Sequence, residues 1–354
     1  MTPPVLRLAI RLALPLLLAG TAVAQVIPAH VAVPFYTPGA FMQGVYRHWY
    51  APRADDFAVQ AAKLGPALEQ LCASGGNPTA AQQSARRQWQ ATVQAWDTLS
   101  AVAVGPLVQR RSLRQIDFTP TRAELIERAI RAAPADAQAM ERVGAPAKGL
   151  PALEWLLWTQ PALPETPACR YAVLVAQGVD DEARALALAF AEQARRNWLE
   201  DEPAAVPAMS ELVNQWVGGI ERLRWAAMEK PQRAAGGKTP AYPRAASGTT
   251  SQSWRAQWRG LQALGVAADN AVPQPGEGLV PLETYLRGRG LNPLAATLAR
   301  SAADAGREMS RVDPAEPTRV NAATRPLATL KRLAEAQLAP ALEVNIGFSD
   351  ADGD

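Results

Sequence analysis

The stretch ARRQWQATVQAWDTL, residues 85–99, repeats large apolar side chains at helical spacing: Trp89, Val93, Trp96 and Leu99. Side chains three and four positions apart lie on one face of an α-helix. This stretch therefore predicts an amphipathic helix with an aromatic inner face.

Three further stretches show the same spacing. One contains Leu186, Phe190, Ala194 and Trp198, and another is expected from about Pro326 to Leu338. In the third, Ser210 is placed to cap a helix with the apolar stripe Leu212, Val213, Trp216, Val217, Ile220 and Leu223. Strand signals are nearly absent, because no long segment alternates apolar and polar residues around a hairpin turn. The sequence predicts an all-α fold of packed helical bundles.

The length of 354 residues fits two domains or one large one, at about 100–200 residues per domain. Thirty prolines and 24 glycines predict short helices with frequent breaks. Between Pro231 and Ser251, eleven of 21 residues are Gly, Pro, Ser or Thr, which predicts a linker or long loop over residues 231–251. We therefore expect an N-terminal helical-bundle domain over residues 25–230 and a C-terminal helical domain over residues 252–354.

One short pattern occurs twice. The sequence G-L-x-x-L-E-x-x-L is found at residues 149–157 and again at residues 278–286. Duplication of a helical unit would give the two halves equivalent helix starts. Coincidence is the alternative, since leucine is common in this chain.

The first 24 residues have the pattern of a secretory signal peptide. Arg7 and Arg11 precede the short apolar run 12–19, and Ala22 and Ala24 fit a cleavage site. We expect a periplasmic or secreted protein after cleavage near Ala24. The apolar run is shorter than the roughly 20 residues that span a bilayer, and no later stretch comes close, so we expect no transmembrane segment in the mature chain.

The charge of the chain excludes a nucleic-acid partner. The formal net charge is +3, and removal of residues 1–24 leaves 34 basic and 33 acidic residues. No compact basic block of the kind that binds phosphates is present. The 48% hydrophobic and 19% charged residues are typical of a folded globular protein.

Cys72 and Cys169 are the only cysteines. In an exported chain such a pair predicts a disulfide. A metal site with two thiolates is the alternative, but His30 and His48 are the only histidines that could support it.

Glu154 stands in the strongly apolar segment GLPALEWLLW, residues 149–158. Pro151 fits the first position of a helix, which would place Glu154 in the first turn, where the helix dipole favours a carboxylate. A helix-start role is the simple explanation. A carboxylate with such apolar neighbours must otherwise find a partner, bind a cation or take up a proton, so a functional role stays open.

Several blocks resemble the imelysin-like family of exported bacterial proteins, which are classed as M75-type peptidases and linked to iron uptake. GLPALEWLLW is similar to the family signature G-x-H-x-x-E-aromatic-L-L. Other similar segments are residues 89–96, Gly105-Pro106, residues 116–122, 247–251 and 347–354. The resemblance implies two helical-bundle domains related by an approximate two-fold pseudo-symmetry, with a site at their junction that includes Gly149.

The chain departs from the family signature at Pro151, which stands where the signature has His. Imidazole ligates metals and transfers protons near neutral pH, whereas proline does neither, so peptidase activity based on the His–Glu pair is not expected. Glu154 and Asp117 remain as oxygen ligands for a cation, unless Arg122 neutralises one of them. His48 is the candidate for a replacement imidazole, and an exposed or packed histidine is its alternative.

We therefore expect a non-enzymatic protein that binds a ligand, metal ion or protein partner of an iron or metal uptake system at a cleft near Glu154. The cation would be iron or another divalent ion. One alternative is a metallopeptidase with Glu154 as general base and the metal held elsewhere. The other is an exported helical scaffold in which Glu154 merely begins a helix.

Overall fold

The computed structural model describes residues 31–75, 79–269 and 271–347, and within these ranges all regular structure is helical. The predicted all-α fold is confirmed. The predicted signal peptide, His30 and residues 348–354 lie outside the described residues. None of the described helices is long and apolar enough to cross a membrane.

The helical elements, with η marking 3₁₀- and π-helical turns, are α1 (Pro38–Val45), η1 (Tyr46–Tyr50), α2 (Ala51–Ala61), α3 (Leu64–Cys72), α4 (Thr79–Leu99), α5 (Pro106–Gln109), α6 (Ser112–Ile116), α7 (Ala123–Ala132), α8 (Ala137–Glu141), η2 (Ala145–Ala147), α9 (Gly149–Glu154), η3 (Trp155–Thr159), α10 (Pro167–Arg195), α11 (Glu202–Glu221), η4 (Arg222–Glu229), α12 (Lys230–Ala234), α13 (Thr250–Gly265), α14 (Leu282–Gly288), α15 (Asn292–Ser310), α16 (Pro317–Leu333), η5 (Ala334–Leu338) and α17 (Ala339–Ala341).

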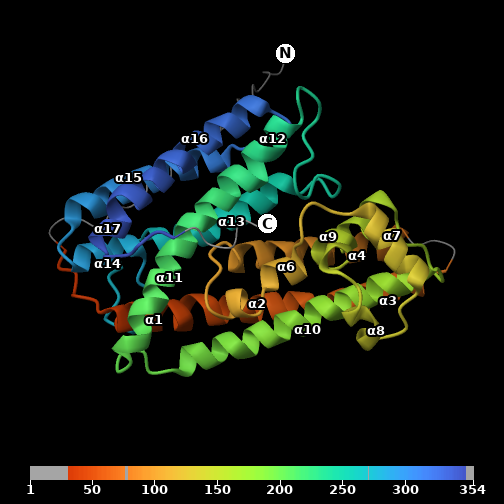
Figure 1. Ribbon diagram of the computed structural model, residues 1–354, viewed down its shortest axis with the longest axis horizontal. Helices are drawn as coiled ribbons and strands as arrows, with labels where there is room; N and C mark the ends of the chain where they lie inside the picture. Colours follow the sequence, from red (N-terminus) through yellow and green to blue (C-terminus); the bar gives the residue numbers. More distant parts are fainter. Residues whose placement is uncertain (1–30, 76–78, 270, 348–354) are drawn as a thin grey trace, which may run out of the picture.

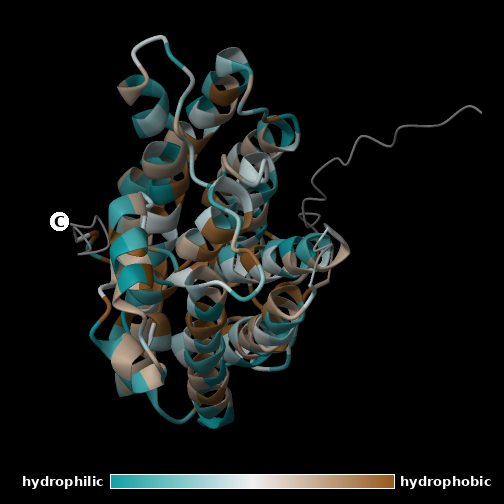
Figure 2. Cartoon of the chain, turned by 90° about the vertical axis from the view of Figure 1, so that its right-hand side faces the viewer, coloured by the Kyte–Doolittle hydropathy of each residue, from teal (hydrophilic) through white to brown (hydrophobic). Residues whose placement is uncertain are grey.

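Two groups of helices lie side by side (Figure 1). In one group, α10 runs along α2 and α3, and α4 packs on the same two helices. In the other, α16 packs on α15, α11 and η4. Hydrophobic residues lie mainly on the sides of the helices that face other helices (Figure 2). The buried hydrophobic side chains form a continuous core through both groups.

The two groups meet where α13 lies along α4 and where α1 packs on α11. Gly260 permits the first of these contacts, because a Cβ atom there would lie 2.5 Å from the carbonyl oxygen of Thr98. Helix α11 lies before residues 231–251 in the chain and packs on α16 and α13. The division into domains at residues 231–251 stays a prediction.

The predicted helix over residues 85–99 is α4, which begins at Thr79 and buries Trp89 and Trp96. The prediction that Ser210 caps a helix is wrong. Helix α11 begins at Glu202, where the side chain of Asp201 accepts a hydrogen bond from the backbone of Ala204. This cap satisfies an amide at the helix start, so Ser210 lies inside the helix.

Prolines do not end the helices as expected. Helix α16 begins at Pro317 and continues through Pro326, and α10 extends for 29 residues. A proline inside a helix costs one backbone hydrogen bond, and packing of α16 on three neighbouring elements offsets that loss. Trp198 lies beyond the end of α10 but is buried.

The predicted disulfide between Cys72 and Cys169 is confirmed. It joins the last residue of α3 to the first turn of α10. The covalent bond therefore fixes two helices that also pack along each other.

The repeated pattern does not begin two equivalent helices. Helix α9 starts at Gly149, whereas α14 starts at Leu282, the counterpart of Leu153. The two glutamates of the pattern are nevertheless both buried. Glu283 pairs with Arg287 at 2.8 Å and accepts a hydrogen bond from the backbone of Ala267 at 3.1 Å. The two-fold pseudo-symmetry stays a prediction.

Candidate functional site

Helix α9 is held tightly between α4 and α6. Gly149 begins it with φ +72°, and a Cβ atom at this position would lie 2.3 Å from the carbonyl oxygen of Ile116. The indole nitrogen of Trp89 donates a hydrogen bond to the carbonyl oxygen of Leu150 at 3.0 Å. Glycine is required here because other residues rarely adopt this φ and lack the space. Pro151 is buried as the third residue of the helix.

Glu154 is the sixth residue of α9 and lies beyond the first turn, so its explanation as a helix-start residue is wrong. Its carboxylate is 6% exposed. One oxygen, Oε1, accepts hydrogen bonds from the backbone of Ser247 at 2.9 Å and from its hydroxyl at 2.7 Å. Ser247 belongs to residues 235–249, the site loop, which connects α12 to α13.

The site loop also supplies a buried arginine. Arg244 adopts φ +65°, and its guanidinium reaches Asp117 at the end of α6 with an Nη2–Oδ2 distance of 2.7 Å. The same carboxylate oxygen accepts a hydrogen bond from the indole of Trp96 at 3.3 Å. The guanidinium lies over the ring of Trp89, 5.6 Å from its centroid. The guanidinium of Arg244 is therefore removed from water and lies between the negative charge of Asp117 and the aromatic face of Trp89.

Three carboxylates surround this guanidinium. Burial by itself lowers the pKa of Arg244, but the charges of Asp117, Asp97 and Glu154 raise it further than burial lowers it. We call Asp97, Asp117, Glu154 and Arg244 the carboxylate centre. Its residues come from α4, the end of α6, α9 and the site loop, so it connects elements that are far apart in the chain.

Asp97 is the unusual member of the carboxylate centre. It is 2% exposed, and burial raises its pKa to about 7. The positive charge of Arg244 lowers the pKa of Asp97, and the negative charge of Asp117 raises it. Side-chain hydrogen bonds from Ser253 and Gln257 on α13 lower this pKa further, because they favour the charged carboxylate. The sequence offered a signal for Asp97, since it follows Val93 by four positions and so lies on the apolar face of the predicted helix.

The carboxylate centre has more acceptors than donors. Oδ2 of Asp97 and Oδ1 of Asp117 are buried without a hydrogen-bond partner in the part of the chain that the structure describes. Buried polar atoms are normally satisfied, and one guanidinium balances only one of three carboxylates when all are ionised. The geometry therefore favours an additional proton or cation.

Two sequence-predicted candidates do not join this centre. Arg122 is exposed at the start of α7, so it is not the salt-bridge partner of Asp117 or Glu154. His48 is exposed in η1. Arg244 was missed because a Gly- and Pro-rich stretch has no periodicity, and its partner Asp117 is 127 residues away.

The family model for imelysin, designated peptidase M75, matches residues 50–339. The chain belongs to the imelysin family. An imelysin-like protein from Psychrobacter arcticum 273-4 has a similar structure, with a TM-score of 0.70 and 21% identity over 90% of this chain and 100% of that one.

A second imelysin-like fold is that of a Parabacteroides distasonis ATCC 8503 protein whose name describes it as an iron-regulated protein A precursor. Its TM-score is 0.67, with 15% identity over 87% of this imelysin chain and 96% of that one. No functionally curated protein matches the sequence. At these identities the two structures establish the shared fold.

We expect Asp97 to make the stability of this imelysin depend on pH. An aspartate in an unfolded chain titrates near pH 3.9, whereas burial raises the pKa of folded Asp97 to about 7. Between these values the folded protein binds a proton that the unfolded chain does not. The stabilisation from this proton is complete below the unfolded pKa and is lost as the pH rises through about 7.

Urea unfolding of the wild type and Asp97→Asn measures this effect. The free energy of unfolding of the wild type relative to the variant should fall by about 2–3 kcal/mol from about pH 5 to about pH 8. Asp181→Asn removes an exposed carboxylate from α10 and is the control. A difference between wild type and Asp97→Asn that does not change with pH would show that Asp97 does not titrate in this range.

Proposed function

We propose that this imelysin is a non-enzymatic binding protein of an iron or metal uptake system, exported to the periplasm, that takes a cation at the carboxylate centre. The observation that carries the proposal is the gathering of two buried carboxylates, Asp97 and Glu154, and the half-buried carboxylate of Asp117 around one buried guanidinium. Carboxylate oxygens are the ligands that hard cations prefer. In the structure, the guanidinium of Arg244 occupies the place of the cation among the three carboxylates and acts as their internal counter-ion.

With the site loop in this position, the carboxylate centre does not fit a bound metal. Among residues 31–75, 79–269 and 271–347 no group of three or more His, Cys, Asp or Glu side chains is close enough to hold one. Arg244 lies beside Asp117, and Ser247 occupies Oε1 of Glu154. Both Arg244 and Ser247 belong to the site loop. Release of this one loop would free Asp117 and Glu154 together, so we infer that the cation competes with the loop.

A link to iron is supported by the name of the P. distasonis protein, which describes iron regulation. No specific observation favours hydrolysis. Oε1 of Glu154 accepts its hydrogen bonds from Ser247 of the site loop, and His48 is exposed. Cleavage of peptides that is sensitive to a chelator and is lost in Glu154→Gln would favour the metallopeptidase alternative.

Calorimetric titration of the chelator-treated protein with iron(II) tests the proposal. We expect the wild type to bind and Glu154→Gln to bind about tenfold or more weakly, since a charged oxygen ligand is lost. Glu283→Gln is a matched control, because Glu283 occupies the equivalent place in the repeated pattern and is equally buried. Its iron affinity should equal that of the wild type.

Two results would contradict the proposal. Absence of binding heat in the wild type, together with no metal in the purified protein, would reject cation binding. Equal weakening in Glu154→Gln and Glu283→Gln would show that the substitutions act through stability rather than through ligation.

A further inference from the structure

A hollow of about 630 Å³ adjoins the disulfide, on elements that do not contribute to the carboxylate centre. It lies between the end of α3, the start of α10 and residues 133–135, which connect α7 to α8. Its walls are mainly apolar and include Pro134, Tyr171 and Leu174. The volume is that of a site for a small molecule.

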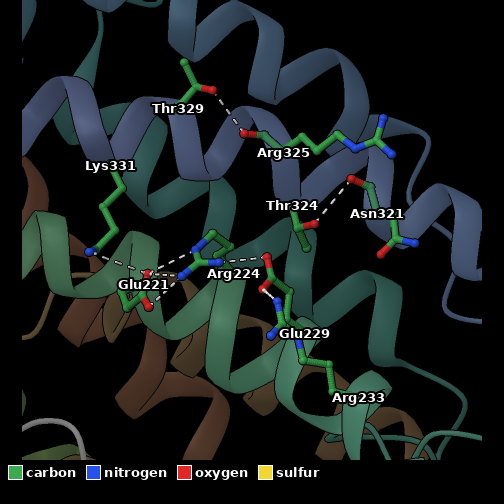
Figure 3. A network of polar contacts seen from close by, with 9 residues as sticks. All are labelled: Glu221, Arg224, Glu229, Arg233, Asn321, Thr324, Arg325, Thr329 and Lys331. Carbon is green, nitrogen blue, oxygen red and sulfur yellow. Dashed lines mark hydrogen bonds and ion pairs between the residues drawn. The ribbon is translucent and has the colours of Figure 1, made fainter. Parts of the chain in front are cut away.

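Another hollow, between η4, α12 and α16, has a polar lining instead. Figure 3 shows that its carboxylate, Glu229, pairs with Arg224 at 2.7 Å and with Arg233 at 3.2 Å. These ion pairs fix the wall formed by η4 and neutralise the carboxylate. The hollow beside the disulfide, in contrast, borders a bond that can react.

The hollow beside the disulfide reaches one cysteine of the pair. Cys72 lines it and is partly exposed, whereas Cys169 lies outside its lining and is 1% exposed. Thiol–disulfide exchange requires a thiolate to approach the sulfur that it attacks. A thiol in the hollow therefore has access to Cys72 and not to Cys169.

The two helices also place the sulfurs differently. Cys169 is the third residue of α10, and its backbone donates a hydrogen bond to the side chain of Thr166 at the helix start. Cys72 is the last residue of α3. The helix dipole stabilises a thiolate at the start of a helix and destabilises one at its end, which favours Cys169 as the leaving thiolate. Burial of Cys169 opposes this preference, so access to Cys72 decides which sulfur is attacked.

We propose that Cys72 is a site of thiol–disulfide exchange with a small thiol that enters this hollow. The thiolate attacks Sγ of Cys72, a new S–S bond forms between the two, and the bond to Cys169 breaks with its electron pair leaving on Cys169. A second thiol that attacks the mixed disulfide leaves both cysteines reduced and the small molecule as its own disulfide. Exchange at this site disconnects α3 from α10 and involves neither the carboxylate centre nor iron.

Mass spectrometry of the folded protein after brief exposure to reduced glutathione, with N-ethylmaleimide to block free thiols, tests the proposal. Glutathione on Cys72 together with maleimide on Cys169 should be at least about tenfold more abundant than the reverse pattern. The same reaction in urea is the control, because unfolding removes both the hollow and the helices. There the two patterns should agree within about twofold.

Ala135→Trp tests the role of the hollow. Ala135 lines it, and an indole at this position should slow formation of the Cys72 adduct about tenfold, because it blocks the approach to the sulfur. Ala315→Trp, on the exposed connection between α15 and α16, is the matched control and should leave the rate unchanged.

Three results would overturn the proposal. They are equal adducts on the two cysteines of the folded protein, no adduct until the protein unfolds, and equal reaction rates in Ala135→Trp and Ala315→Trp. None of these outcomes depends on iron binding at Glu154, so the two proposals fail separately.

Discussion

Replacement of Arg244 by Gln is expected to lower the free energy of unfolding by about 3–5 kcal/mol at neutral pH. The guanidinium is 2% exposed and is the counter-charge for Asp117, Asp97 and Glu154. Without it, buried carboxylates lose their partner, and the cost of an uncompensated buried charge is large. Arg244 has a backbone φ of +65°. Glutamine at this position has to adopt the same φ, so the comparison of wild type and variant isolates the side chain.

Urea unfolding monitored by tryptophan fluorescence measures this loss. The deficit should shrink as the pH falls, since protonated carboxylates need no counter-charge. Arg332→Gln, which removes an exposed arginine from α16, is the control and should change stability by less than about 0.5 kcal/mol. A loss below about 1 kcal/mol in Arg244→Gln, independent of pH, would show that the carboxylate centre does not depend on Arg244.

The same variant also informs the proposed function. If a cation competes with Arg244, iron(II) should stabilise Arg244→Gln more than it stabilises the wild type, because a ligand that binds only the folded state raises its stability. Equal stabilisation of both proteins by iron(II) would show that the cation does not compete with Arg244, whose role would then be structural.

Removal of the disulfide is the second large effect. Cys72→Ser combined with Cys169→Ser should lower the free energy of unfolding by about 4–5 kcal/mol, the chain-entropy value for a closed loop of this length. The bond spans 97 residues and joins α3 to α10. Its loss enlarges the conformational freedom of the unfolded chain and leaves the helical contacts in place.

Equilibrium unfolding in urea, with circular dichroism as the signal, measures the effect. The reduced wild type is the matched control and should unfold at the same urea concentration as the double variant. An oxidised wild type no more stable than either would contradict the prediction. Native circular dichroism of the variant without urea would establish that packing alone suffices to form the helices.

The apolar periodicity of residues 85–99 predicted α4 correctly because helix formation depends on neighbours three and four positions away. The cysteine pair predicted the disulfide because no other cysteine competes. The signature segment predicted the family, while a functional role of Glu154 stays a prediction. The segment misplaced the helix start, since Gly149 rather than Pro151 begins α9, through a backbone conformation that depends on the contact with Ile116.

The two arginines show where prediction from sequence ends. Arg122 lies five residues from Asp117, and the sequence offered it as a salt-bridge partner of Asp117 or Glu154 beside the alternative of cation binding, yet it is exposed. Arg244 lies 127 residues from Asp117 and pairs with it. The Gly- and Pro-rich composition of residues 231–251 predicted a loop, and residues 235–249 of that stretch form one between α12 and α13. Composition carries no information about which elements a loop touches.

By itself, the sequence determined the all-α class, the helix that buries Trp89 and Trp96, the cysteine pair and the family, because each depends on local spacing or on a contiguous motif. Only the tertiary structure decided that Asp97, Asp117 and Glu154 share Arg244, and that the hollow beside the disulfide borders Cys72 rather than Cys169. The physical reason is that charge pairing and burial depend on distance in space. Here the packing of two groups of helices places side by side residues that are far apart in the sequence.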